Sequence, residues 1–158
     1  MTTTLTAATM TVTITEIISL NGTNQGATNT LSLASIAEVS KRIVNVPASE
    51  VEVVKMGTAV AAGQFIESTV KYIRFTNLDD TNHIGLIFKN ENDDEFGVKL
   101  DKGQSFIYNG DIAGGVVDTM DAQDGGADLG ANTFADLVNV TAIADTAACD
   151  MEILVAST

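Results

Sequence analysis

The chain has 158 residues, a length typical of a single domain, and its 8 Lys and Arg against 21 Asp and Glu give a formal net charge of −13. Hydrophobic residues make up 45% of the chain, enough to bury a core, so the sequence is not a disordered acidic tail. One Cys excludes an intrachain disulfide, one Cys with one His excludes a His/Cys zinc site, and the acidic charge argues against DNA or RNA as a partner.

The first nine residues are rich in threonine and lack the basic and long apolar regions of a signal peptide. No stretch of the sequence approaches the ~20 apolar residues of a membrane helix, so we expect no membrane partner. We predict a flexible N-terminal arm at residues 1–9 that orders against a neighbour; a disordered terminus is the alternative.

The dominant period along the chain is two. Residues 10–15 alternate Met, Val and Ile with Thr, which predicts a strand with one apolar face. Asn21-Gly22 predicts a turn, because both residues tolerate positive φ, and residues 23–29 a loop before a short strand at 30–33. Residues 35–46 fit either a helical face or a turn that leads into a strand, and we favour the turn and strand. A strand at 50–56 and a loop at 57–63 follow.

The middle of the chain has four short apolar segments separated by polar turns. They are residues 70–76, 84–88, 96–100 and 104–108, and this spacing is typical of a sandwich or barrel built by hairpins. The Gly- and Asp-rich residues 111–131 predict an exposed excursion with a short strand at 116–117, before two final strands at 137–143 and 151–155. With about nine strands, we predict an all-β fold: one antiparallel β-sandwich domain over residues 10–158, of the jelly-roll type.

The charge is unevenly distributed. Residues 1–102 hold 12 acidic and all eight basic residues, whereas residues 103–158 hold nine acidic residues and no base. A solvated acidic face that favours solubility is the simpler interpretation. The alternative is a surface that repels nucleic acid and anionic membranes and docks on a complementary partner.

The residues that could carry chemistry form no recognisable site. His83 is the only histidine and precedes a strand, where a surface loop residue is the simpler interpretation than a general base. An acidic neighbour raises a thiol pKa, so Cys149 beside Asp150 is interpreted as a small buried hydrophobe. A carboxylate pair could serve a glycosidase, but the sequence has no Trp and only two Tyr to bind a sugar.

Calcium is the most plausible ligand among weak options. Hard oxygen ligands occur on one Gly-containing stretch, at Asp118, Asp121, Asp124 and Asp128. Their spacing matches neither the EF-hand loop nor the Gly-Gly-x-Gly-x-Asp repeat, and residues 90–95 are as well explained by a polar hairpin tip. We therefore assign no catalytic, cofactor-binding or metal residue, expect no cofactor, and expect that the protein is not an enzyme.

Three segments resemble small β-rich virion proteins of tailed bacteriophages, especially phages of marine bacteria and cyanobacteria. The first is a strand with the Tyr-Ile-Arg-Phe-Thr-Asn pattern and its polar turn, the second an apolar strand, and the third a Leu-Asp-x-Gly-Gln-Ser turn into another strand. These segments are Lys71–Asn82, Ile84–Phe88 and Glu95–Phe106, the last continuing to Tyr108. The opening Thr11–Glu16 and Leu20–Gly22 also fit, and the resemblance covers most of residues 10–110.

The resemblance implies a virion structural protein made in the host cytoplasm. It points to a capsid decoration or cement protein that binds the major capsid protein on the outer surface of the shell and self-associates as a homotrimer. A tail or neck accessory protein is the first alternative, and a carbohydrate- or receptor-binding module, which the same fold supports, is the second.

Overall fold

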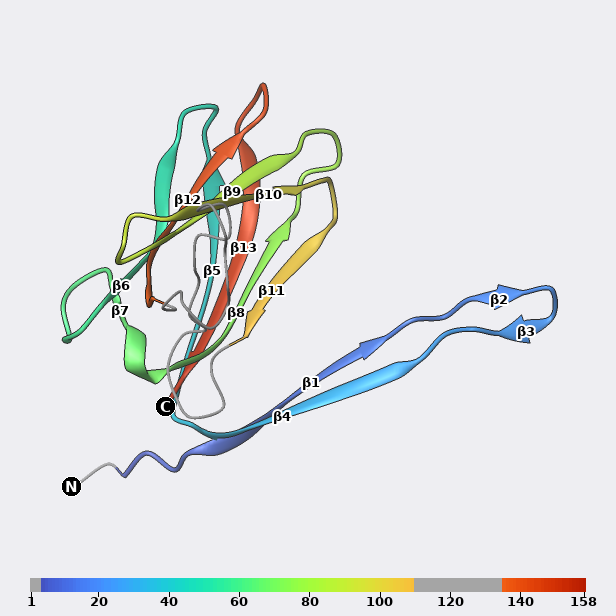
Figure 1. Cartoon of the computed structure of the whole chain (residues 1–158), viewed down its shortest axis with the longest axis horizontal. Helices are drawn as coiled ribbons and strands as arrows, with labels where there is room; N and C mark the ends of the chain where they lie inside the picture. Colours follow the sequence, from blue (N-terminus) through green and yellow to red (C-terminus); the bar gives the residue numbers. More distant parts are fainter. Residues whose placement is uncertain (1–3, 110–134) are drawn as a thin grey trace, which may run out of the picture.

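A computed structural model describes residues 4–109 and 135–158 and shows two packed β-sheets from which a long hairpin projects (Figure 1). The predicted all-β sandwich is confirmed, while its jelly-roll connectivity stays a prediction. The predicted excursion at 111–131, with its strand at 116–117 and its four candidate calcium ligands, lies outside the described residues.

One sheet has five strands and the other has four. In spatial order, the five-stranded sheet consists of β10 (Glu95–Leu100), β9 (Ile84–Asn90), β12 (Leu137–Ala144), β6 (Val51–Gly57) and β7 (Phe65–Ile66). The four-stranded sheet consists of β11 (Ser105–Asn109), β8 (Val70–Asn77), β13 (Cys149–Ser157) and β5 (Glu38–Val46). Pairing is antiparallel except between β6 and β7, and a short 3-10 helix, η1 (Glu67–Thr69), links β7 to β8.

The connectivity differs from a chain of hairpins. Among the described strands of the sandwich, only β9 and β10 are sequence neighbours that pair antiparallel. Residues 78–83 and 101–104 instead carry the chain from one sheet to the other. The ambiguous residues 35–46 hold no helix: all nine residues of β5 pair with β13, from Glu38 opposite Ser157 to Val46 opposite Cys149.

The core lies between the two sheets. Alternate residues of the paired strands point inward, as the period of two predicts, and the rings at the centre are those of Phe75 on β8 and Phe88 on β9. The Phe88 ring packs edge-on against Phe75 at 5.8 Å between centroids and stacks on Tyr108 at 5.3 Å. These contacts join strands of both sheets.

The first four strands of the described chain belong to neither sheet. β1 (Ala8–Thr15) pairs with β4 (Thr28–Ile36), and at the far end β2 (Ser19–Leu20) pairs with β3 (Thr23–Asn24). We call residues 8–36 the hairpin arm. The sequence predicts an arm at 1–9 and a sandwich from residue 10, whereas in the structure the strands of the sandwich begin with β5. A period of two reveals a strand but not its partner.

Candidate interaction surface: the hairpin arm

The turn at the end of the arm has the predicted chemistry. Asn21 and Gly22 have φ angles of 51° and 79°, and Leu20 pairs with Thr23 across them. Two consecutive residues with positive φ make a type I′ turn, whose twist matches the flanking strands. The Asn-Gly dipeptide therefore closes the arm as a tight hairpin.

Gly26 keeps the arm continuous where its tip joins its shaft. A Cβ atom at this position would lie 2.0 Å from the carbonyl oxygen of Glu16, so only glycine allows the two chains to approach so closely. Backbone hydrogen bonds on either side, from Glu16 N–H to Ala27 O at 2.9 Å and from Gln25 N–H to Ile18 O at 3.0 Å, tie the two chains together.

The shaft of the arm has one apolar and one hydroxyl-bearing face. Val12 lies opposite Leu31, and Met10 opposite Leu33, so both strands place apolar side chains on the same face. The other face carries Thr and Ser in three cross-strand pairs: Thr11–Ser32, Thr13–Thr30 and Thr15–Thr28.

The base of the arm is docked on the outer face of the four-stranded sheet. Ile36 from the arm, Tyr72 from β8 and Ala156 from β13 form a small buried cluster that is separate from the main core. Five partly buried side chains pack around it: Met10, Val12, Leu33, Ile107 and Leu154. This cluster holds the arm at a defined position on the sandwich.

The direction of the arm is set next to this cluster. Ser35 has a φ angle of 63°, a left-handed conformation that is uncommon for a residue with a side chain. The N–H of Ala37 then donates to Ser157 O at 2.9 Å, and β5 begins at the next residue. The chain is thereby redirected from the arm into the edge of the four-stranded sheet.

Beyond its base, the arm presents apolar side chains to solvent. Ile14 and Leu31 are exposed on the apolar face, and near the tip the exposed fractions reach 92% for Ile17 and 60% for Leu20. A two-stranded ribbon is only marginally stable by itself in water. Exposed apolar side chains that cluster on one projecting element are typical of an interaction site.

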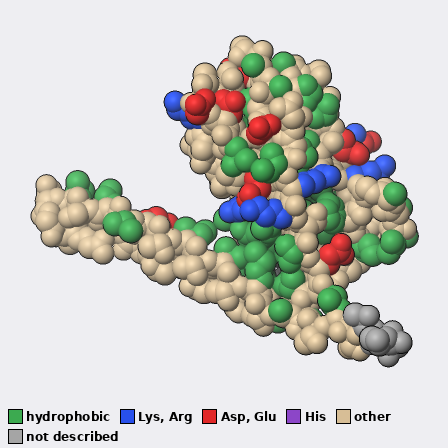
Figure 2. Space-filling view, turned by 180° about the vertical axis from the view of Figure 1, so that it is seen from behind, with side chains coloured by type: hydrophobic (Ala, Val, Ile, Leu, Met, Phe, Trp, Pro, Cys, Tyr) green, Lys and Arg blue, Asp and Glu red, His purple; other side chains and the backbone are tan. Residues whose placement is uncertain are grey.

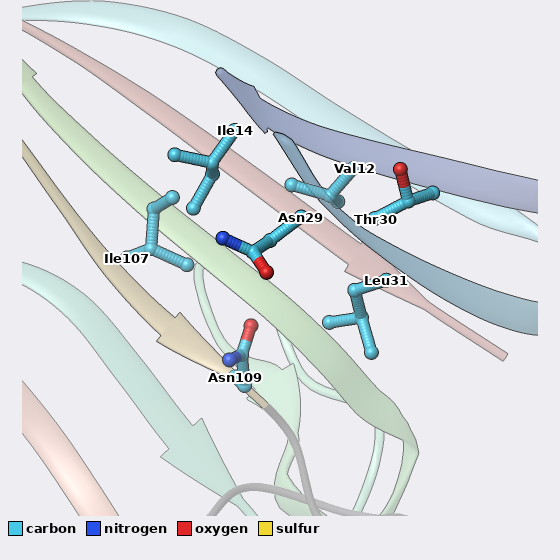
Figure 3. Close-up of a pocket in the computed structure, with 7 residues that line it drawn as sticks. All are labelled: Val12, Ile14, Asn29, Thr30, Leu31, Ile107 and Asn109. Carbon is cyan, nitrogen blue, oxygen red and sulfur yellow. The ribbon is translucent and has the colours of Figure 1, made fainter. Parts of the chain in front are cut away.

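A hollow of about 230 Å³ lies in the angle between the arm and the sandwich (Figure 3). Its apolar lining comes from Val12 and Ile14 on β1, Leu31 on β4 and Ile107 on β11. The polar residues of the lining are Asn29, Thr30 and Asn109. The hollow joins the apolar face of the arm to the outer face of the sheet.

Charged groups near this angle are on the sandwich rather than the arm. Glu16 is the only charged residue between positions 4 and 37. On the outer face of the sheet, Glu152 pairs with Lys41 at 2.9 Å and also with Arg74. The hydrogen bond from Lys41, together with both positive charges, lowers the pKa of Glu152. Figure 2 shows hydrophobic side chains gathered where the arm meets the sandwich, with Lys and Arg side chains at their border.

The two residues considered above as possible catalytic groups, Cys149 and His83, make packing and pairing contacts in the structure. Cys149 is fully buried with its thiol directed at Ala147 O, and burial, followed by the charge of Asp79, raises its pKa. His83 Nδ1 lies 3.4 Å from a carboxylate oxygen of Asp145 in a half-exposed pair between two connecting segments. In the part of the chain that the structure describes, neither side chain is combined with both a base and an orienting group, the arrangement that nucleophilic catalysis requires.

The polar segment at 90–95 is organised by one amide. The Asn90 side chain accepts hydrogen bonds from the N–H groups of Asn92 and Asp94 and donates to the Asp94 carboxylate, which shapes the turn between β9 and β10. Among the residues that the structure describes, no three His, Cys, Asp or Glu side chains are grouped so that they could hold a metal ion.

The distal arm is the feature that sequence reasoning missed. Its signal was present: residues 10–14 and 31–33 are apolar alternating segments on either side of an Asn-Gly turn. We interpreted these segments as strands of the sandwich because apolar alternation normally indicates a buried face.

Comparisons with protein-family models, with curated proteins and with solved structures found no match to this chain. Within residues 4–109 and 135–158, no helix has the length and apolar character needed to cross a membrane.

Proposed function

We propose that this chain is a structural protein of a bacteriophage virion that decorates the outer surface of the capsid and joins the shell through its hairpin arm. Its role is mechanical: it links neighbouring subunits and thereby stabilises the shell. The major capsid protein is its proposed partner in the lattice.

The observation that carries this proposal is the arm itself. The sandwich has its own buried core, and a separate small cluster holds the base of the arm on it. Beyond that base, the apolar side chains of the arm, a two-stranded ribbon, are largely exposed. Such a ribbon gains stability when a partner covers it, because burial of apolar surface contributes about 25 cal/mol per Å². A rigid body with a projecting apolar ribbon suits a protein that ties subunits together.

The charge distribution supports a location outside the shell. The net charge of −13 opposes contact with packaged nucleic acid, whose phosphates attract Lys and Arg. An acidic body also resists nonspecific association in solution. The uncharged shaft of the arm is free of this repulsion and can approach another protein surface.

The test is binding of the purified chain to capsids prepared without it. We expect the full chain to co-sediment with these capsids and to raise the temperature at which they open. Replacement of residues 16–27 by Asn-Gly keeps the Thr15–Thr28 pair and the docked base of the arm, so this variant should fold and lose at least tenfold in affinity.

A variant on the hydroxyl face provides the matched control. Thr13→Ser keeps a hydroxyl opposite Thr30 and should bind capsids as the full chain does. Binding to tails or necks but not to capsids would replace the decoration role by an accessory role in the same particle. Retention on glycans with no binding to any virion part would overturn the proposal.

A further inference from the structure

A second surface without a partner lies on β5. This strand is at the end of the four-stranded sheet, and no described strand pairs with its outer edge. Two of its apolar side chains point to the outer face of the sheet and are largely exposed, Val39 at 58% and Ile43 at 61%. An open edge flanked by exposed apolar side chains is a template for pairing with another strand.

The charges of this surface are opposite to the charge of the arm. Lys41 lies between Val39 and Ile43 on the same face, and it is 59% exposed even though it contacts Glu152. Lys41 and Arg74 share that one carboxylate, so the centre of the face has a surplus positive charge within a chain of net charge −13. Asp150, at the end of the face near Val46, is hydrogen-bonded to Asn45.

The arm has the complementary arrangement. Its only charged group, Glu16, precedes the exposed pair Ile17 and Ile18. A carboxylate beside apolar side chains on the arm thus matches a positive charge between apolar side chains on β5. Charge complementarity of this kind sets the orientation of an interface.

The two surfaces cannot meet within one copy. Only Ala37 separates the arm from β5, and the arm runs away from the sandwich, so its tip is remote from the β5 strand of the same chain (Figure 1). We propose that the arm of one copy docks on the open edge and outer face of β5 of a second copy. This inference rests on the proposed function in one respect: that function has the chain link neighbouring subunits, and the inference names a second copy of this chain as the subunit that the arm contacts.

The resulting contact joins different surfaces of the two copies. In a dimer of this kind, the arm of one copy and the β5 strand of the other have no partner. Further copies therefore add until the assembly closes as a ring. The docked strand extends the four-stranded sheet by backbone hydrogen bonds, while its apolar side chains cover Val39 and Ile43. Each copy in a closed ring gives one arm and receives one.

The experiment measures the mass of the purified full chain, without any capsid, by light scattering after size-exclusion chromatography. Two variants each remove one half of the contact: Ile17→Asn with Ile18→Asn on the arm, and Val39→Asn with Ile43→Asn on β5. A third variant, Thr11→Asn, changes the hydroxyl face of the arm and serves as the control. All of these side chains are exposed, so circular dichroism should show an unchanged fold.

We expect the full chain and the control to form oligomers and each double variant to be monomeric. An equimolar mixture of the two double variants should form a dimer, because the intact arm of the β5 variant meets the intact β5 of the arm variant. A β5 variant that still oligomerises would show that arms pair with arms and would overturn the proposal. A monomeric full chain would also overturn it, and separate capsid binding would then leave the proposed function standing.

Discussion

At the scale of single residues, Asn77 fixes two of the crossings between the sheets, the one after β8 and the one after β10. Its fully buried amide donates to Asn82 O at 2.9 Å and to Leu100 O at 3.1 Å, and it accepts from the N–H of Asp79 at 2.9 Å. One side chain therefore satisfies backbone groups of the segment after β8 and of the end of β10. Buried polar groups need such partners, because an unpaired one is costly.

Replacement of this amide should destabilise the sandwich. Asn77→Ala leaves the Leu100 carbonyl without this donor in a buried place, so we expect the free energy of unfolding to fall by about 1–3 kcal/mol. Urea denaturation measures the change. Asn45→Ala is the control: its exposed amide makes a hydrogen bond to Asp150, and its loss should change stability by less than about 0.5 kcal/mol. Equal losses for both variants would contradict this role of Asn77.

Two carboxylates should respond oppositely to pH. Burial, followed by the nearby charges of Asp136 and Glu91, raises the pKa of Glu67, so its ionisation opposes folding and stability is lost as pH rises through its folded pKa. The hydrogen bond from Lys41 lowers the pKa of Glu152, so the stability it contributes is present at neutral pH and lost as pH falls through its folded pKa.

We therefore expect Glu67→Gln to be more stable than the natural chain at pH 7, and Glu152→Gln to be less stable. The difference at Glu67 should disappear below the unfolded pKa of a glutamate, and the difference at Glu152 only below its lower folded pKa, because each carboxyl group is then protonated in both states. Thermal unfolding between pH 3 and pH 8 measures both curves. Differences of the same sign at pH 7 would contradict the assignment.

At the scale of elements, contacts at the base of the arm hold it on the sandwich, whereas its distal part is exposed. Ile36 is buried against Tyr72 and Ala156, whereas Ile17 near the tip is almost fully exposed. Ile36→Ala should lower the free energy of unfolding by about 2–4 kcal/mol, since it leaves a cavity under the arm. Ile17→Ala should change it by less than about 0.5 kcal/mol.

Hydrogen exchange measures the same docking locally. In the Ile36→Ala variant, the amides of β1 and β4 should exchange faster with solvent. The amides of β8 and β9 in the sandwich should keep the same ranking of exchange rates as in the natural chain. Unchanged exchange in the arm would show that the small cluster does not hold it.

The same elements show what the sequence could predict. Clear alternation at Phe96, Val98 and Leu100, bounded by polar turns, predicted β10 well because local pattern and turn chemistry agree. Residues 10–15 have equally clear alternation, yet their strand pairs only within the arm. Strand identity is encoded locally, whereas the choice of partner depends on contacts distant in sequence.

The candidate site was harder to predict than the fold for the same reason. Val39 and Ile43 are four residues apart and fit a helical face as well as a strand, and in the structure they lie on the outer face of the edge strand. Only the register with β13 shows which face of β5 is inside. Exposed apolar side chains could be recognised once the sheets were placed, and not before.

At the scale of the whole molecule, charge and apolar surface are separated. All eight basic residues and every described acidic residue except Glu16 belong to the sandwich and its loops, and Glu16 is the only charged residue of the hairpin arm.

 Two copies therefore repel each other through their bodies, while the arm can bridge them. This separation favours contact by the arm over contact by the acidic surfaces.

The salt dependence of self-association follows from this separation. Each copy has a net charge of −13, so repulsion between whole copies involves many more charges than the single attraction between Glu16 and the face around Lys41. The screening length falls from about 30 Å at 0.01 M salt to about 8 Å at 0.15 M, which weakens the long-range repulsion most. We therefore expect the apparent Kd of self-association to decrease severalfold over this range.

Sedimentation velocity at the two salt concentrations measures this change. The Glu16→Gln variant separates the two contributions: it loses the attractive pair and keeps the repulsion between bodies, so it should associate more weakly at low salt and gain more from added salt than the natural chain. Association that weakens as salt is added would mean that ion pairs dominate the contact. The apolar side chains of the arm and of β5 would then be a minor part of the interface, contrary to the exposure of Ile17 and Ile43.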